Sequence, residues 1–155
     1  MTANGGLYIS PDFSDFADRG TAEIKALLLH YAARSPSAPI IIGCGSMGGQ
    51  VCWNLAKDPV IGPRLGGLLM LGSFPDESFL TSAAFRAKVP IFFGHGGADT
   101  VVSINKQEQF FRSISVRSPG YPVRFVRFET GSHGTPIRMT DWRLVLNWML
   151  EVDGK

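Results

Sequence analysis

Short apolar runs alternate along the chain with longer segments in which apolar residues recur at helical spacing. In the last long segment Trp142, Val145 and Met149 lie at i, i+3 and i+7, which places them on one face of a helix. Amphipathic helices are predicted at residues 21–34, 46–57, 103–114 and 141–151. The short runs predict strands at residues 7–9, 39–42, 68–71, 89–93 and 124–128.

Five strands that alternate with helices predict a mostly parallel sheet of about five strands with helices on both faces, a three-layer α/β sandwich. Thr21 and Ser103 are the predicted N-caps of the first and third helices. The 155 residues suffice for one buried core, and no repeat or linker divides them. We therefore expect a single domain over residues 1–155.

Composition narrows the possible partners. The 45% hydrophobic and 18% charged residues describe a globular protein, and a formal net charge of +2 argues against nucleic acid or an anionic membrane as the main partner. The sequence has only two cysteines, Cys44 and Cys52, which excludes a disulfide-dense scaffold. Their spacing is neither that of a zinc knuckle nor that of a CxxC redox pair. We expect no metal and no cofactor.

Targeting signals are not apparent. Residues 1–6 show no basic region followed by an apolar stretch, and the apolar runs are too short to span a bilayer. The sequence therefore predicts no signal peptide, no membrane span and a cytoplasmic protein.

The turn after the second predicted strand, residues 43–49, reads GCGSMGG and has two interpretations. The first is a nucleophile elbow, in which Ser46 adopts a strained backbone conformation that projects its Oγ. Small residues are needed two positions before and after the serine, where Cys44 and Gly48 stand. The backbone N–H of Met47, at the start of the helix, would face a developing oxyanion.

The second interpretation is a dinucleotide-binding turn of an NAD(P)-dependent oxidoreductase. Residues 43–48 match G-x-G-x-x-G, follow a strand and open a helix. Such a turn is accompanied by an acidic residue about 20 positions on, at the end of the next strand. The next predicted strand continues into Gly72-Ser73-Phe74 without an acid, and Asp76 comes late. A purely structural glycine-rich turn is a third possibility.

Two loops downstream carry further candidates. Asp99 lies in a glycine-rich loop after residues 89–93, where a carboxylate can orient an imidazole. His133 follows residues 124–128 in another glycine-rich loop and is a candidate base. Because the carboxyl ends of parallel strands share one edge of a sheet, we expect Ser46, Asp99 and His133 to meet there.

Serine, acid and histidine in this order resemble the α/β-hydrolases. The elbow at residues 41–49, the acid loop at 94–99 and the histidine loop at 131–134 are similar to those of carboxylesterases, acyl-thioesterases and polyhydroxybutyrate-depolymerase-like members. The resemblance covers roughly residues 7–150 and implies a serine hydrolase that cleaves a small to medium acyl ester or thioester through an acyl-enzyme. It implies Ser46 as nucleophile, His133 as base and Asp99 as acid.

The resemblance also implies that part of the usual fold is missing. Residues 6–13 look like the family's fourth strand, so the chain is expected to start after the family's first three strands. In the family, the second oxyanion donor comes from the loop after the third strand. Three explanations stay open: a truncated product, a minimal hydrolase in which residues 12–15 supply that donor, or strands contributed by another subunit of a homo-oligomer. A catalytically impaired hydrolase-fold binding module is the non-enzymatic alternative.

Three other residues are given secondary roles. His30 lies within a predicted amphipathic helix and is expected to be structural. His95 precedes Asp99 by four residues and is expected to structure the acid loop. Asp76, after the third predicted strand, is the reserve candidate for the acid.

Overall fold

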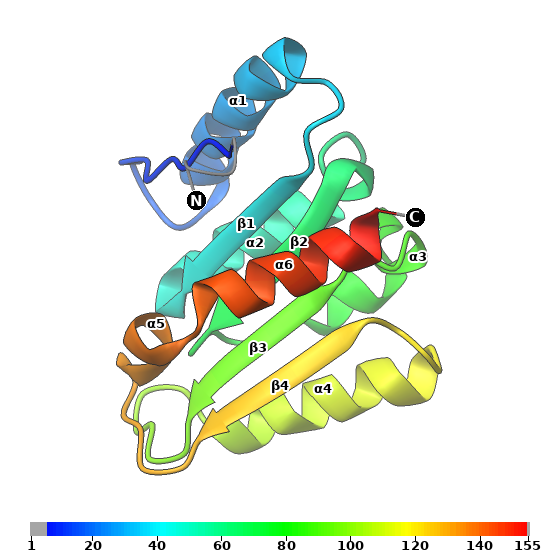
Figure 1. Ribbon diagram of the computed structural model, residues 1–155. Helices are drawn as coiled ribbons and strands as arrows, with labels where there is room; N and C mark the ends of the chain where they lie inside the picture. Colours follow the sequence, from blue (N-terminus) through cyan, green and yellow to red (C-terminus); the bar gives the residue numbers. More distant parts are fainter. Residues whose placement is uncertain (1–5, 155) are drawn as a thin grey trace.

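The fold is built on one four-stranded parallel sheet with the strand order β1-β2-β3-β4 (Figure 1). The computed structural model describes residues 6–154. A parallel sheet between helices confirms the predicted α/β class, with four strands where the sequence suggested about five. The strands are β1 (Ile40–Gly45), β2 (Leu65–Leu71), β3 (Ile91–Gly96) and β4 (Val123–Phe128).

Residues 7–9 were expected to form the first strand, and this prediction is wrong. They lie in an irregular segment before the first helix, where Leu7 and Tyr8 are 67% and 64% exposed. An apolar run becomes a strand only beside a neighbour that satisfies its backbone groups, and in the described sheet β1 pairs with β2 alone. The expectation of no signal peptide concerns residues 1–6, of which 1–5 lie outside the described residues.

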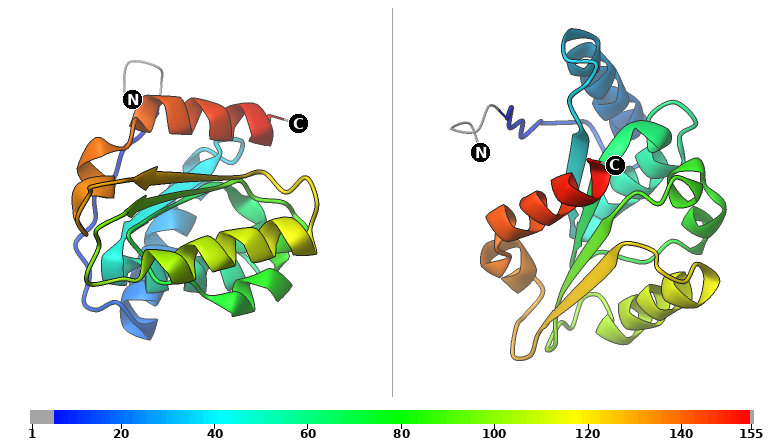
Figure 2. Two further views of the ribbon diagram at one scale, coloured as in Figure 1. Left: turned by 90° about the horizontal axis from the view of Figure 1, so that it is seen from below. Right: turned by 45° about the vertical axis from the view of Figure 1, so that its right-hand side comes forward.

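Helices cover both faces of the sheet (Figure 2). On one face α2 and α4 pack against the strands and α1 packs against α2, while α6 lies alone on the other face. The short helix α5 lies at the carboxyl end of β3. The helices are α1 (Asp18–Arg34), α2 (Gly49–Lys57), α3 (Ala83–Arg86), α4 (Ile104–Arg117), α5 (Thr135–Met139) and α6 (Trp142–Asp153).

The two faces of the sheet bury separate apolar cores. Trp53 of α2 lies between the rings of Phe79 and Phe110 in the larger core, and Trp148 and Met149 of α6 close the smaller one. β2 and β3 are buried along their whole length because both faces are covered, as in other parallel sheets. These two strands are the rigid base beneath the edge on which the loops gather.

The start of α1 differs from the prediction. Thr21 is not its N-cap; the helix begins at Asp18, and the carboxylate of Asp15 accepts from the backbone N–H groups of Ala17 and Gly20 at 2.9 Å each. An aspartate in the preceding loop thus binds the amide of the N-cap residue and one free amide of the first turn. Ser103 does precede α4, although its side chain makes no capping hydrogen bond.

Within residues 6–154, none of the helices is both long enough and apolar enough to cross a membrane.

Candidate active site

Ser46 stands at the apex of a strand-to-helix turn. It follows β1 directly and opens the 3-10 turn η2 (Ser46–Gly48), which runs into α2. Its φ of 52° lies in the left-handed region, one of two such values among described non-glycine residues. A residue with a Cβ pays for this conformation, so the turn holds its serine under strain, as the elbow interpretation requires.

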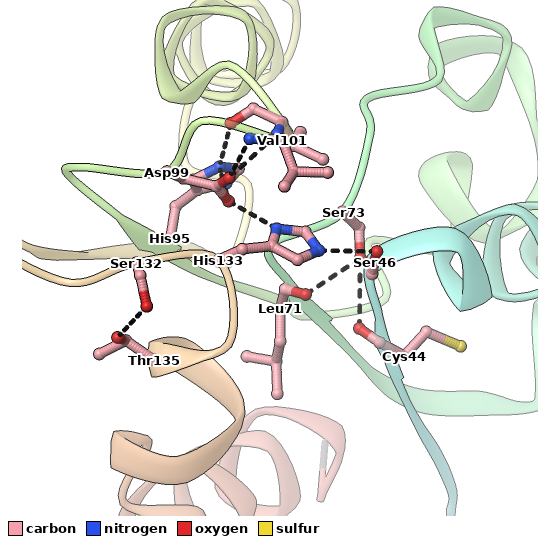
Figure 3. Close-up of polar contacts among 11 residues, drawn as sticks. Cys44, Ser46, Leu71, Ser73, His95, Asp99, Val101, Ser132, His133 and Thr135 are labelled. Carbon is pink, nitrogen blue, oxygen red and sulfur yellow. Dashed lines mark hydrogen bonds and ion pairs between the residues drawn. The ribbon is translucent and has the colours of Figure 1, made fainter.

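Ser46, His133 and Asp99 form one hydrogen-bonded chain (Figure 3). Nε2 of His133 lies 2.7 Å from Oγ of Ser46, and Nδ1 of the same ring lies 2.8 Å from Oδ2 of Asp99. Because the carboxylate can only accept from Nδ1, the ring carries a hydrogen there and Nε2 is free to take the serine proton. The three side chains come from the ends of β1, β3 and β4.

The carboxylate of Asp99 is buried and well hydrogen-bonded. Its side chain is 0% exposed, and its Oδ1 accepts from the backbone N–H groups of Val101 at 2.8 Å and Val102 at 3.0 Å. Burial by itself raises the pKa of this carboxyl, but the bonds from Val102, His133 and Val101 outweigh it and lower the pKa overall. Asp99 is therefore an anion wherever His133 needs an acceptor.

His95 lies behind Asp99, away from the serine (Figure 3). Its ring is fully buried, and its Nε2 lies near two acceptors, 3.0 Å from the carbonyl oxygen of Val102 and 3.3 Å from Oδ2 of Asp99. Nδ1 has no hydrogen-bond partner among the described residues. The position is consistent with the predicted role in structuring the acid loop.

The acid and histidine loops are joined through their backbones. The N–H of Gly97 donates to the carbonyl oxygen of Phe128 at 2.7 Å, and the N–H of Ala98 donates to the carbonyl oxygen of Gly131 at 2.9 Å. A Cβ on Gly96 would lie 2.3 Å from the carbonyl oxygen of Gly131, so this close approach requires glycine. Gly96 and Gly97, which precede Asp99, thus set the distance between the acid and histidine loops.

The glycines of the turn at residues 43–48 do not form an open cradle for a pyrophosphate. A Cβ on Gly45, the second glycine of the pattern, would lie 2.7 Å from Cδ1 of Ile137, whose side chain fills that space. On Gly43 it would lie 3.4 Å from the ring of Trp142. The second glycine of a dinucleotide fingerprint leaves room for the cofactor, whereas here α5 occupies it.

Other candidate residues are placed elsewhere. Asp76 binds Lys57 at 2.6 Å and the backbone N–H of Ser78 at 2.9 Å, so the reserve acid serves a different contact. His30 lies on the exposed side of α1 beside Arg34. In the segment at residues 12–15, the amide of Phe13 donates to the carboxylate of Asp12 and the amide of Ser14 donates to the carboxylate of Glu23. These two amides therefore do not act as the second oxyanion donor.

A disulfide between Cys44 and Cys52 is the feature of this site that the sequence analysis missed. It joins the end of β1 to the second turn of α2, on either side of Ser46. The signal was present: in a strand–turn–helix unit the helix packs back on its strand, which brings residues eight apart together. The buried Ser73 lies next to this unit and donates to the carbonyl oxygen of Cys44 at 3.3 Å (Figure 3).

Known hydrolases resemble this chain in sequence and in fold. No family model matches the chain. In sequence it is similar to acyl-protein thioesterase 1 of Debaryomyces hansenii, with 30% identity over 128 residues that cover 70% of this chain and 54% of the relative. The chain therefore spans about half the length of the curated relative that it matches.

Solved structures share the fold at low sequence identity. A thermostable esterase superposes with a TM-score of 0.70 at 19% identity, over 86% of this chain and 36% of its own. An esterase of Pyrococcus furiosus superposes with a TM-score of 0.62 at 13% identity, over 92% of this chain and 65% of its own. Acyl-protein thioesterase 2 of Zea mays superposes with a TM-score of 0.53 at 17% identity, over 89% of this chain and 70% of its own.

The strand order, the serine turn and these likenesses together define the class: the chain is an α/β-hydrolase-fold protein. Within that class its sequence is similar to an acyl-protein thioesterase.

Proposed function

We propose that this chain carries the catalytic centre of a serine hydrolase that cleaves small to medium acyl esters or thioesters, with Ser46, His133 and Asp99 as its triad. The observation that carries the proposal is the continuous chain from Ser46 Oγ through the ring of His133 to Asp99, with both links at hydrogen-bond distance. The similarity to a thioesterase and to esterase structures supports the same chemistry.

Acylation begins at Ser46. Nε2 of His133 takes the hydroxyl proton as Oγ attacks the substrate carbonyl carbon, and the anionic Asp99 stabilises the imidazolium that forms. The tetrahedral oxyanion is met by the backbone N–H of Met47, the residue after the nucleophile. Collapse of the intermediate expels the alcohol or thiol, which takes the proton back from His133.

Deacylation uses the same groups. His133 takes a proton from a water molecule as that water attacks the acyl carbonyl, and the second tetrahedral intermediate releases the carboxylic acid and restores Ser46. The side chain of His133 is 26% exposed, so water reaches the ring from solvent without movement of the loop.

Exposed apolar side chains lie on the segments that adjoin the proposed triad, and they favour an acyl substrate. Met47 follows Ser46 and is 59% exposed, Ile137 lies over Gly45 and is 47% exposed, and Val101 of the acid loop is 62% exposed. An acyl chain laid across such side chains loses water-exposed surface, at about 25 cal/mol per Å². A shallow apolar surface of this kind suits short and medium chains.

The test is hydrolysis of p-nitrophenyl butyrate by the purified chain and two serine variants. Ser46→Ala is expected to lower kcat on the order of 10⁴-fold or more, as loss of a triad nucleophile does. Ser132→Ala is the matched control, because Ser132 neighbours His133 in sequence but contacts only Thr135 among the described side-chain bonds. Equal activity of wild type and Ser46→Ala would refute the proposal, and no activity in folded wild type would favour a binding module.

A further inference from the structure

Cys44 and Cys52 hold the serine turn from both sides. Cys44 is the last but one residue of β1, two positions before Ser46, and Cys52 is a buried residue of α2. Their disulfide closes a loop with a sequence separation of 8 that contains the whole turn. The sequence has only these two cysteines, so any effect of thiol chemistry on the protein acts on this one bond.

The strand that carries the serine, β1, is one of the two edge strands of the described sheet. β1 lies at the edge of the described sheet and pairs with β2 on one side, and its residues are half-buried or exposed. β2 and β3, in contrast, are buried throughout. The register of β1 on β2 also shifts between Ile40 and Ile41. One neighbouring strand holds β1, and the covalent bond from Cys44 to Cys52 is an additional constraint at its carboxyl end.

That constraint matters because Ser46 is held in an unfavourable conformation. Its φ of 52° lies in a region that residues with a Cβ rarely adopt, and it persists only where the surroundings leave no alternative. Cys44 is held by its pairing with Met70 in the β1–β2 ladder, by the 3.3 Å bond from Ser73 to its carbonyl oxygen, and by the disulfide. The ladder pairing and the hydrogen bond from Ser73 can break and re-form, whereas the disulfide is covalent.

We propose that the Cys44–Cys52 disulfide is a positioning element for the nucleophile, so that the hydrolase activity depends on the thiol redox state of the protein. The inference rests on the proposed function for its catalytic readout. With the bond intact, the end of β1 is fixed to α2 and Ser46 Oγ stays at Nε2 of His133. With the bond reduced, the turn relaxes from its left-handed conformation and Oγ leaves hydrogen-bond distance.

The chemistry is an exchange of two electrons with a small dithiol such as dithiothreitol. Its thiolate attacks the sulfur of half-buried Cys44, because Cys52 is 0% exposed, and the Cys52 sulfur leaves as a thiolate that takes up a proton. The second thiol of the reductant then displaces Cys44 as a thiol and forms a cyclic disulfide. Oxidised glutathione reverses the change and is itself reduced to two molecules of glutathione.

The rest of α2 keeps its place without the bond. Val51, Trp53 and Leu55 anchor the helix in the larger core with at most 3% exposure. Lys57 at its end binds Asp76. Reduction is therefore expected to loosen the turn while the fold is kept, which separates a positioning role from a purely structural one.

The experiment compares the oxidised chain, the chain reduced with dithiothreitol, the reduced chain reoxidised with glutathione disulfide, and the variant Cys44→Ala/Cys52→Ala. Thiols titrated in denaturant report the state of the bond in each sample. Reduction is expected to lower kcat for p-nitrophenyl butyrate by about tenfold or more, with KM changed by less than about twofold, because misplacement of a reacting atom acts on the chemical step. Reoxidation is expected to restore kcat, and the double variant is expected to have low kcat that reductant does not change.

Amide hydrogen exchange provides a readout that does not depend on catalysis. Reduction is expected to accelerate exchange at residues 44–49 and to leave β2 and β3 unchanged. Two free thiols in the oxidised sample, or unchanged kcat and exchange after verified reduction, would overturn the inference. Inactivity of the oxidised chain would count against the proposed function instead, and the exchange measurement would still decide whether the bond holds the turn.

Discussion

Nε2 of His95 lies 3.3 Å from Oδ2 of Asp99 while it donates to the carbonyl oxygen of Val102, the residue whose own N–H binds the same carboxylate. His95 thus closes a ring of contacts around the acid: carboxylate, Val102 amide, Val102 carbonyl and imidazole. All four groups belong to residues that are buried or half-buried. The acid loop owes its shape to this ring as well as to its glycines.

Replacement of His95 by leucine is expected to loosen the acid loop. The carbonyl oxygen of Val102 would lose its partner in a buried place, which costs about 1–3 kcal/mol and lowers Tm by roughly 2–12 °C. The value of kcat is expected to fall because Asp99 is less well fixed. His95→Gln, which retains an N–H donor, is expected to recover part of both losses. Thermal unfolding and ester hydrolysis measure the two effects, and a leucine variant with wild-type Tm and kcat would contradict this role.

Gly72 and Gly120 provide a matched pair for testing the position of His133. Both have positive φ, +57° and +74°, so alanine at either site costs about 1–2 kcal/mol of stability. A Cβ on Gly72 would lie 3.1 Å from the carbonyl oxygen of His133, whereas Gly120 has no atom within 4 Å of that position. We expect both variants to lose similar stability and only Gly72→Ala to lose activity, by about tenfold. Equal activity of the two in an ester assay would argue against this contact.

Gly49 and Gly48 distinguish where the serine turn needs a small residue. A Cβ on Gly49 would lie 2.6 Å from Cβ of Ser73, which is too close. A Cβ on Gly48 would have its nearest neighbours, atoms of Cys44 and Phe16, at 3.9 Å, an ordinary contact distance. Gly49→Ala is therefore expected to cost about 1–3 kcal/mol through overpacking. Gly48→Ala is expected to change stability by less than about 1 kcal/mol, since alanine suits a helical backbone better than glycine. Urea unfolding measures both, and the reverse order would contradict the packing described for this turn.

Acid is expected to destabilise the fold through carboxylates such as Asp76. Burial raises the pKa of Asp76, but the bonds and charge of Lys57 and the bonds from Ser78 outweigh it and lower the pKa. A carboxyl whose pKa is lower in the folded state stabilises the protein above its unfolded pKa, about 3.9, and loses that contribution as pH falls below this value. Urea unfolding at pH 3, 5 and 7 is expected to show less loss of stability toward pH 3 in Asp76→Asn than in wild type. An identical pH dependence would exclude Asp76 from the acid response.

The sequence predicted the central part of the molecule well. The run at residues 68–71 and its neighbours in β3 are buried on both faces, so their apolar pattern reports directly on the core. Ser46, Asp99 and His133 each follow a strand, and parallel strands bring such positions to one edge whatever the details of the loops. That topology is enough to predict that the three residues lie near one another.

The pattern of apolar and polar residues does not predict features that depend on contacts with distant parts of the chain. Residues 7–9 have the composition of a strand, but no neighbouring strand in the described sheet receives them. Asp15, rather than Thr21, satisfies the first turn of α1 because the preceding loop folds back on it. The short helix α5 and the Cys44–Cys52 bond likewise follow from contacts between loops, helix and strand rather than from periodicity.

The most direct test of the account is reaction of the folded chain with a fluorophosphonate, followed by intact mass measurement and peptide mapping. We expect one adduct per chain, located on Ser46, because this serine alone among the described serines has its Oγ within 2.7 Å of a histidine nitrogen backed by a carboxylate. The adduct is expected to be absent from Ser46→Ala and strongly reduced in His133→Ala. A folded wild-type chain that gains no adduct, or that carries it on another residue, would contradict the assignment of Ser46 as the nucleophile.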